Sequence, residues 1–281
     1  MSDNATPRDG TTSDEHVFAD DEGATRSVSI EEFNSAGREL WESHAGWWQE
    51  NFSEGVDPEY TEQILPLIAA RVLNAGAVLE IGVGEGQVLR TVGAHSSTSS
   101  LRVGIDPSFA QCRVAQQRSS GEYIARAEAK CLPFASDTFD LVIACLVFEH
   151  IVEVDEAIVE VARVLRPGGR FLFLLNHPLL QTPNSGWIDD QILMEQYWRI
   201  GNYLSEDVTV EEVHKGVFIP FVHRPLSRYV NALADVGLYL RHMDEPAPPQ
   251  GFLAQAWEYQ EAAQIPRLLA LELEKATRVE R

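Results

Sequence analysis

Glu80-Ile81-Gly82-Val83-Gly84-Glu85-Gly86 is the stretch that decides the fold of this 281-residue chain. It ends an apolar strand predicted at 77–81 and precedes a helix predicted to begin at Gln87. Three alternate glycines remove the Cβ atoms that would hold a ligand away from the backbone, and they permit the positive-φ turn that a strand-to-helix junction needs. A dinucleotide fingerprint of the G-x-G-x-x-G kind needs a glycine at position 87, so the glutamine there weakens a pyrophosphate-binding interpretation. The stretch predicts a cofactor loop.

A second short strand, predicted at 101–105, ends at Asp106, where nucleotide sites place the acid that binds a ribose. Three further segments follow in order: EAKCLPF at 128–134, FDLVIA at 139–144 and LRPGGR at 165–170. Together the five segments resemble a class I S-adenosylmethionine-dependent methyltransferase of the small-molecule group often called type 11. The resemblance covers about 77–175 and is weaker outside that range.

The resemblance implies S-adenosylmethionine as cofactor and assigns roles to matching residues. Glu80 would lie at the ammonium end of the methionine moiety, and Gly82, Gly84 and Gly86 would let the backbone approach the cofactor. Asp106 would accept hydrogen bonds from both ribose hydroxyls, since a carboxylate offers a diol two acceptors in one plane. Glu128 and Ala129 would bind adenine, and Cys145 would border the methionine part and the substrate. The chain departs from the family at Glu128, where aspartate is usual, and at Lys130, where an acid is frequent.

Composition narrows the possible partners. The formal net charge of −21 disfavours nucleic acid and anionic membrane surfaces, because both require basic protein surface. The three cysteines form no C-x-x-C pair, and no cluster of histidines and carboxylates indicates a metal site. No signal peptide and no apolar run long enough to span a bilayer is visible. We expect a cytoplasmic protein without a bound metal; the sequence does not indicate its oligomeric state.

The organisation predicted along the chain is a disordered acidic tail at 1–28 and a methyltransferase domain at 29–281 with its core at 77–175. Helices are expected at 30–48 and 58–73. Alternating strands and helices predict an α/β, doubly wound, Rossmann-like fold with a seven-stranded, mostly parallel sheet. The last strand, near 267–273, is expected to be antiparallel, although its sequence taken alone fits a helix equally well. An irregular, aromatic-rich segment at about 176–216 is expected to be an inserted cap over the site.

Several residues are candidates for the acceptor side of the site. His150 and His177 follow predicted strands and could serve as general bases, since histidine titrates near neutrality; the alternative for His150 is that it only orients a loop by hydrogen bonding. Arg224 could pair with a substrate carboxylate or cap neighbouring backbone. Trp47, Trp48 and Tyr197 could form the substrate pocket, or simply belong to the core.

The function expected from these features is methyl transfer from S-adenosylmethionine to an oxygen or nitrogen nucleophile of a small molecule. The Asn-Pro-Pro-Tyr type of motif is absent, which disfavours methylation of bases and of glutamine. Two alternatives stay open: a methyltransferase acting on a protein or RNA, and a protein that binds the cofactor without turnover. A nicotinamide oxidoreductase is a further alternative, against which the residue at position 87 argues.

Overall fold

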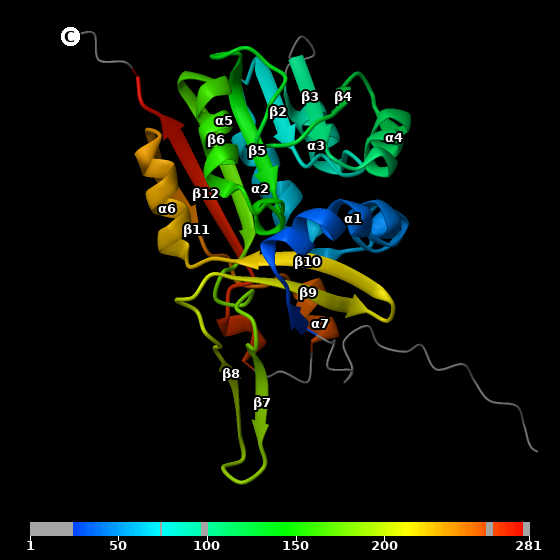
Figure 1. Ribbon diagram of the computed structural model, residues 1–281, viewed down its shortest axis with the longest axis vertical. Helices are drawn as coiled ribbons and strands as arrows, with labels where there is room; N and C mark the ends of the chain where they lie inside the picture. Colours follow the sequence, from blue (N-terminus) through cyan, green and yellow to red (C-terminus); the bar gives the residue numbers. More distant parts are fainter. Residues whose placement is uncertain (1–24, 74, 97–100, 257–260, 278–281) are drawn as a thin grey trace, which may run out of the picture.

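The predicted strands join in one seven-stranded sheet (Figure 1). The computed structural model describes residues 25–73, 75–96, 101–256 and 261–277. The strands of the sheet are β2 (Ala77–Ile81), β3 (Leu101–Asp106), β4 (Tyr123–Arg126), β5 (Phe139–Cys145), β6 (Leu165–Asn176), β11 (Leu238–Asp244) and β12 (Leu268–Lys275). Their spatial order is β11-β12-β6-β5-β2-β3-β4. Strands β2 to β6 pair in parallel, whereas β12 is antiparallel to both of its neighbours. The predicted doubly wound fold is confirmed, including its antiparallel last strand.

Burial on both faces explains why the central strands have nearly continuous apolar sequences. Side chains of β5 alternate between two apolar clusters, with Val142 and Ala144 on one face and Leu141 and Ile143 on the other. The first face is covered by α5 (Val154–Val164) and α6 (Leu226–Asp235), and the second by α2 (Leu65–Arg71) and α3 (Gln87–His95). The same two-sided burial makes β12 a strand, because Leu269, Leu271 and Leu273 enter one cluster whereas Leu268 and Ala270 enter the other.

The helix predicted at 58–73 has two parts. A π-helical turn, η1 (Tyr60–Ile64), precedes α2. Pro66, near the start of α2, has no N–H to donate, and its ring would crowd the Glu62 carbonyl in a regular α-helix, so the wider turn accommodates it.

The N-terminal region contributes a long helix and one edge strand. Helix α1 (Ile30–Phe52) begins at Ser29, whose hydroxyl caps the N–H of Glu32 at 3.1 Å. The preceding β1 (Thr25–Ser27) pairs with β9 (Asp207–His214), which in turn pairs with β10 (Val217–His223). The tail predicted at 1–28 therefore extended too far: residues 25–27 form a strand because β9 satisfies their backbone groups. Residues 1–24 lie outside the described part of the chain.

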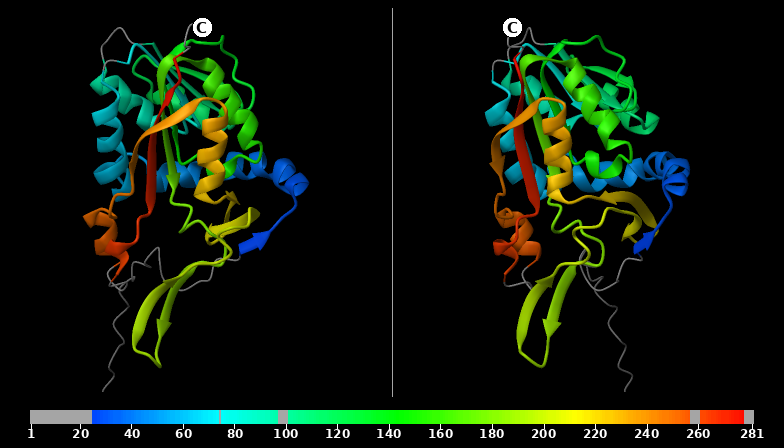
Figure 2. Two further views of the ribbon diagram at one scale, coloured as in Figure 1. Left: turned by 90° about the vertical axis from the view of Figure 1, so that its left-hand side faces the viewer. Right: turned by 60° about the vertical axis from the view of Figure 1, so that its left-hand side comes forward.

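Residues 186–199 of the segment predicted as a cap form a β-hairpin that stands away from the body of the molecule, whereas residues 207–214 of that segment are β9. The strands of the hairpin are β7 (Gly186–Asp190) and β8 (Glu195–Arg199), which pair only with each other (Figures 1 and 2). Four helical elements complete the described fold: α4 (Phe109–Arg118), η2 (Phe148–His150), α7 (Gln250–Gln255) and η3 (Ala262–Gln264). Among the described helices, none is both long enough and apolar enough to cross a membrane.

Candidate active site

A cavity of about 320 Å³ lies at the carboxyl ends of β2, β3 and β5. Open parallel sheets place their ligands at this edge. Helix α1 forms the opposite wall and lies across the strand ends (Figure 1). The α1 residues that line the cavity are Phe33, Gly37, Arg38, Trp41 and Trp48. Residues 176–216 contribute nothing to the lining, so α1 covers the cavity where the inserted segment was expected to do so.

The glycine loop brings backbone, rather than side chains, to the cavity. Gly82 has φ +68°, and a Cβ there would lie 2.3 Å from a methyl carbon of Val147. Gly84 has φ +53° and lines the cavity, and a Cβ added to it would meet no atom within 4 Å. Gly86 adopts a left-handed conformation and begins α3 as its N-cap. Only glycine adopts such conformations without strain, so the three alternate glycines are a backbone requirement of this turn.

Asp106 fixes the end of β3 to the glycine loop. Its Oδ2 accepts from the N–H of Gly84 at 3.0 Å, and its Oδ1 accepts from the N–H of Ser108 at 2.8 Å. Burial raises the pKa of Asp106 to about 6, against the lowering effect of these two hydrogen bonds. The carboxylate is therefore oriented toward the cavity edge while retaining lone pairs for a ligand.

Glu80, at the end of β2, is buried with an unsatisfied oxygen. The backbone of Leu89 supplies one hydrogen bond to its carboxylate, but Oε2 has no partner among the described residues. Burial, aided by the nearby Glu85 carboxylate, raises the pKa of Glu80 well above its usual range. A buried acceptor without a partner is unfavourable, so a cationic group beside it would be stabilising.

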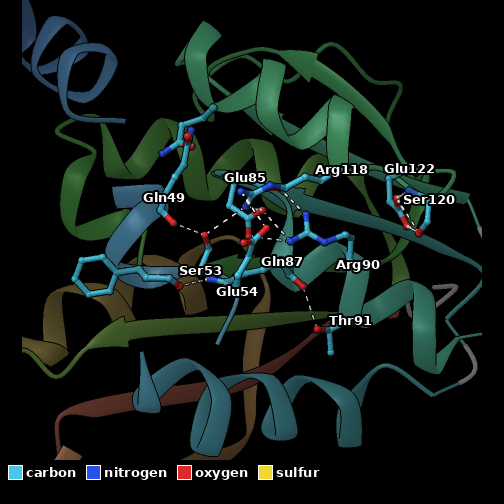
Figure 3. A network of polar contacts seen from close by, with 12 residues as sticks. Gln49, Ser53, Glu54, Glu85, Gln87, Arg90, Thr91, Arg118, Ser120 and Glu122 are labelled. Carbon is cyan, nitrogen blue, oxygen red and sulfur yellow. Dashed lines mark hydrogen bonds and ion pairs between the residues drawn. The ribbon is translucent and has the colours of Figure 1, made fainter. Parts of the chain in front are cut away.

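Glu85 ties the glycine loop to neighbouring helices (Figure 3). Arg90 donates to both of its carboxylate oxygens, at 2.9 and 2.8 Å, and Arg118 of α4 (Phe109–Arg118) donates to Oε2 at 2.7 Å. Arg118 also pairs with Glu54 at 3.1 Å, just beyond the end of α1. The loop, α1 and α4 are therefore held together by one partly buried ionic network.

Glu128, Ala129 and Cys145 also line the cavity. The Glu128 carboxylate forms ion pairs with Arg38 of α1 and, at 3.6 Å, with Lys130. Burial raises the pKa of the Cys145 thiol well above its usual range, so the thiol stays protonated and is a poor nucleophile.

The two candidate bases lie in different places. His150 lines the cavity; its Nδ1 donates to the carbonyl oxygen of Pro220 at 2.7 Å, which makes Nε2 the unprotonated nitrogen of the neutral ring. Burial lowers the pKa of His150 to about 4. His177 is outside the cavity lining: its Nε2 lies 2.8 Å from Glu245 and its Nδ1 accepts from the N–H of Leu179 at 3.2 Å.

Comparison with known proteins agrees with this geometry. The family described as "Methyltransferase domain" matches residues 79–173. A ubiquinone/menaquinone biosynthesis C-methyltransferase, UbiE, of Geobacter sulfurreducens is 30% identical over 43% of this chain and 49% of its own length. Methyltransferase GfsG of Streptomyces halstedii is 33% identical over 45% of this chain and 48% of its own. The chain thus spans about half the length of these curated relatives.

Solved structures extend the likeness beyond the matched segment. An S-adenosylmethionine-dependent methyltransferase from Mesorhizobium loti superposes with a TM-score of 0.64 at 26% identity, covering 75% of this chain and 96% of that one. Residues 79–173 therefore form a methyltransferase domain, and the fold around them is shared with class I S-adenosylmethionine-dependent methyltransferases. S-adenosylmethionine is the cofactor that this domain and these neighbours indicate.

The cavity suits that cofactor chemically. S-adenosylmethionine carries an ammonium, a sulfonium and a ribose diol, and the cavity presents the unpartnered oxygen of Glu80 and the oriented carboxylate of Asp106. Among the described residues, no group of three or more histidine, cysteine, aspartate or glutamate side chains is arranged to hold a metal ion.

The four residues suggested for the substrate pocket are dispersed. Trp48 lines the cavity, but Trp47 packs against Phe52 and against the cluster of β10. Arg224 is buried and donates to the carbonyl oxygens of Ile151 and Val152, at 2.8 Å each, which places it under the cavity loop rather than in the cavity. Tyr197 lies on the hairpin and is 44% exposed.

Among the cavity residues that the sequence did not indicate are three aromatic ones, Phe33, Trp41 and Tyr60. Trp41 and Trp48 are seven residues apart, almost two whole turns of α1, and Phe33 precedes Trp41 by eight residues, so the three share one broad face of the helix. The aromatic residues of this helix face were visible in the sequence, but the sequence did not show that the face is directed toward the cavity. Tyr60 stands on the π-helical turn, a kind of turn that occurs frequently at functional sites, and its hydroxyl is a hydrogen-bond partner of the Cys145 side chain.

Proposed function

We propose that this protein transfers the methyl group of S-adenosylmethionine to an oxygen or nitrogen nucleophile of a small-molecule acceptor. The observation that carries the proposal is the sharing of one cavity by the oriented Asp106, the unpartnered Glu80 and the aromatic wall of α1. A volume of about 320 Å³ suits a small ligand. The three free cysteines support the cytoplasmic location expected from the sequence.

In this proposal each cofactor-side residue has one role. Asp106 accepts hydrogen bonds from the ribose hydroxyls, and Glu80 lies beside the ammonium group. Gly82, Gly84 and Gly86 allow the loop backbone to approach the ligand. Glu128 and the backbone of Ala129 bind the adenine, and Cys145 borders the methionine part.

The chemistry that bound S-adenosylmethionine supplies is an electrophilic methyl group on a sulfonium centre. The chain's own contribution is mainly to hold the acceptor in line and to exclude water with α1. Such positioning supplies about 7–11 kcal/mol of a reaction barrier. His150 is neutral at physiological pH because its pKa is lowered to about 4, so it orients the loop and the acceptor more readily than it removes a proton.

The charge of the cavity favours a neutral or cationic acceptor. Its lining contains two residues that carry a full positive charge, Arg38 and Lys130, and both are engaged in ion pairs. Arg38 pairs with Glu128, and Lys130 lies 2.9 Å from Glu153. An anionic acceptor would need to break one of these pairs, whereas an aromatic or cationic one would pack against Trp41 and Trp48.

The test is calorimetric titration with S-adenosylmethionine of the wild type, Asp106→Asn and the control Asp235→Asn, an exposed aspartate at the end of α6. We expect micromolar binding by the wild type and the control. Loss of two charge-assisted hydrogen bonds should weaken binding by Asp106→Asn about a hundredfold. Absence of binding to the wild type would refute the proposal.

Turnover is then measured as release of S-adenosylhomocysteine with a panel of aromatic amines and phenols, each paired with its carboxylate analogue. Turnover confined to the neutral and cationic members supports the acceptor class. Methylation of lysate protein or RNA instead would support the macromolecular alternative. Preferential binding of NADH would favour an oxidoreductase.

A further inference from the structure

Glu42, in the middle of α1, caps the first turn of α4. Its Oε2 accepts from the hydroxyl of Ser108 and from the N–H of Phe109, both at 2.8 Å, and its Oε1 accepts from the N–H of Ala110 at 3.0 Å. Ser108 is itself the N-cap of α4 and accepts from the N–H of Gln111 at 3.2 Å. A carboxylate from a helix 66 to 68 residues earlier therefore satisfies donors that helix starts leave unpaired.

The same contact leads directly to the cofactor site. The N–H of Ser108 donates to Oδ1 of Asp106 at 2.8 Å, while the Ser108 hydroxyl donates to Glu42. Asp106 and Ser108 are both buried and both line the cavity. The side-chain orientation of Asp106 thus depends on a turn whose other side is held by α1.

A second contact keeps α1 in register on α4. The side-chain amide of Gln49 donates to Oε1 of Gln111 at 2.8 Å, and Gln111 also lines the cavity. Glu42 and Gln49 are seven residues apart, which places them on one face of the helix. Trp41 and Trp48 precede them by one residue each, so the contacts with α4 set the position of the aromatic wall.

We propose that Glu42 is a positioning residue for the cofactor, which holds Asp106 in its ligand-binding orientation and fastens α1 over the cavity. The inference rests on the proposed cofactor site at Asp106. It makes the affinity for S-adenosylmethionine depend on a residue outside the segment that matches the family, since that match begins at residue 79.

A pH profile separates this role from simple helix capping. The charged and titratable groups around Asp106 are Glu42 on α1, Glu80 on β2, Cys112 on α4 and Arg126 on β4, whose Nε donates to the carbonyl of Pro107. Glu42 raises the pKa of Asp106. Removing that negative charge lets Asp106 ionise at lower pH, so the acid limb of cofactor binding moves downward.

The experiment is calorimetric titration of full-length protein with S-adenosylmethionine between pH 5.5 and 8, using Glu42→Ala, Glu42→Gln and Asp106→Asn. The matched control is Glu39→Gln, an exposed carboxylate on the same helix. We expect Glu42→Ala to raise Kd about tenfold, the effect of losing one charge-assisted contact. Glu42→Gln, which keeps an acceptor oxygen, should show a smaller loss with the acid limb shifted to lower pH.

Circular dichroism and thermal melting establish that each variant is folded, and Glu42→Gln carries the test if Glu42→Ala does not fold. Unchanged Kd and an unchanged acid limb in a folded Glu42 variant, with binding lost in Asp106→Asn, would overturn the inference and leave the proposed function standing. If the wild type itself does not bind, the proposed function fails instead. An increase in Kd for the Glu42 variants that only equals the increase for Glu39→Gln would also overturn the inference.

Discussion

The backbone N–H of Gly84 and the carboxylate of Asp106 are joined by a hydrogen bond of 3.0 Å. The glycine is in the loop after β2 and the aspartate ends β3, so the bond connects the carboxyl ends of adjacent parallel strands. Two motifs that are 22 residues apart in sequence thereby become one site. Changes in the loop and changes in the acid should affect the same ligand.

The loop glycines should respond differently to alanine. In Gly82→Ala the new Cβ meets Val147 at 2.3 Å in a left-handed backbone, so we expect a loss of about 2–5 kcal/mol in the free energy of unfolding. In Gly84→Ala the Cβ meets no atom within 4 Å, so only about 1–2 kcal/mol of backbone strain remains and the larger effect should be weaker cofactor binding.

Urea denaturation and cofactor titration of both variants measure the two effects separately. The double variant Gly82→Ala/Val147→Ala removes the clash and should recover part of the lost stability. Equal destabilisation of the two single variants would contradict this account.

His150 should prove dispensable as a base. With its pKa lowered to about 4, the ring is neutral throughout pH 5.5–8.5, and kcat should show no inflection from it. We expect His150→Gln to lower kcat by less than about tenfold, whereas loss of a general base costs about 10²–10⁴-fold. His95→Gln, at an exposed position in α3, is the control for general effects of the substitution. A hundredfold loss confined to His150→Gln would identify it as the base after all.

Glu149 should make the free protein less stable as the pH rises. It is buried; its Oε1 accepts from the backbone and side-chain N–H groups of Asn176 at 3.1 Å each, while Oε2 has no partner among the described residues. Burial raises its pKa to about 7. The folded state therefore holds this proton more tightly than the unfolded chain, and the stabilisation present at low pH is lost as the pH rises through 7.

Between pH 5.5 and 8 this single group should change the free energy of unfolding by about 2 kcal/mol. Glu149→Gln keeps the acceptor for Asn176 and cannot ionise, so its stability should fall less over the same interval. Urea denaturation at several pH values measures the difference. Parallel pH profiles for the wild type and the variant would rule out the assignment.

The hairpin should be separable from the cofactor site. Replacing residues 191–194 with Asn-Gly removes the exposed tip, in which Ile192 is 91% and Met194 83% exposed, and closes the strands with a two-residue turn. Because no residue of 176–216 lines the cavity, Kd for S-adenosylmethionine and kcat should change less than about twofold. A large drop in turnover with intact cofactor binding would place the hairpin in acceptor recognition.

Local sequence patterns were sufficient for the sheet and for the cofactor class. The alternation of short apolar strands with amphipathic helices predicted the doubly wound fold, and the ordered motifs from Glu80 to Gly169 predicted the methyltransferase family, as the structure and the comparisons confirm. The residue roles carried by those motifs stay predictions. The register of β12 needed more than local pattern, because a leucine-rich segment buried on both faces fits a helix as well as a strand.

The sequence by itself thus determined which segments become strands and helices, where the glycine turn lies and which cofactor is indicated. These features depend on residues close together in the chain. Only the tertiary structure decided what closes the cavity. Helix α1 reaches it through contacts such as Glu42 with Ser108 and Arg38 with Glu128, while the expected cap projects away. It also decided that His150 is buried enough to lose its basicity. Contacts between residues 66 to 90 positions apart arise from packing and complementary charge, and a local sequence pattern does not predict them.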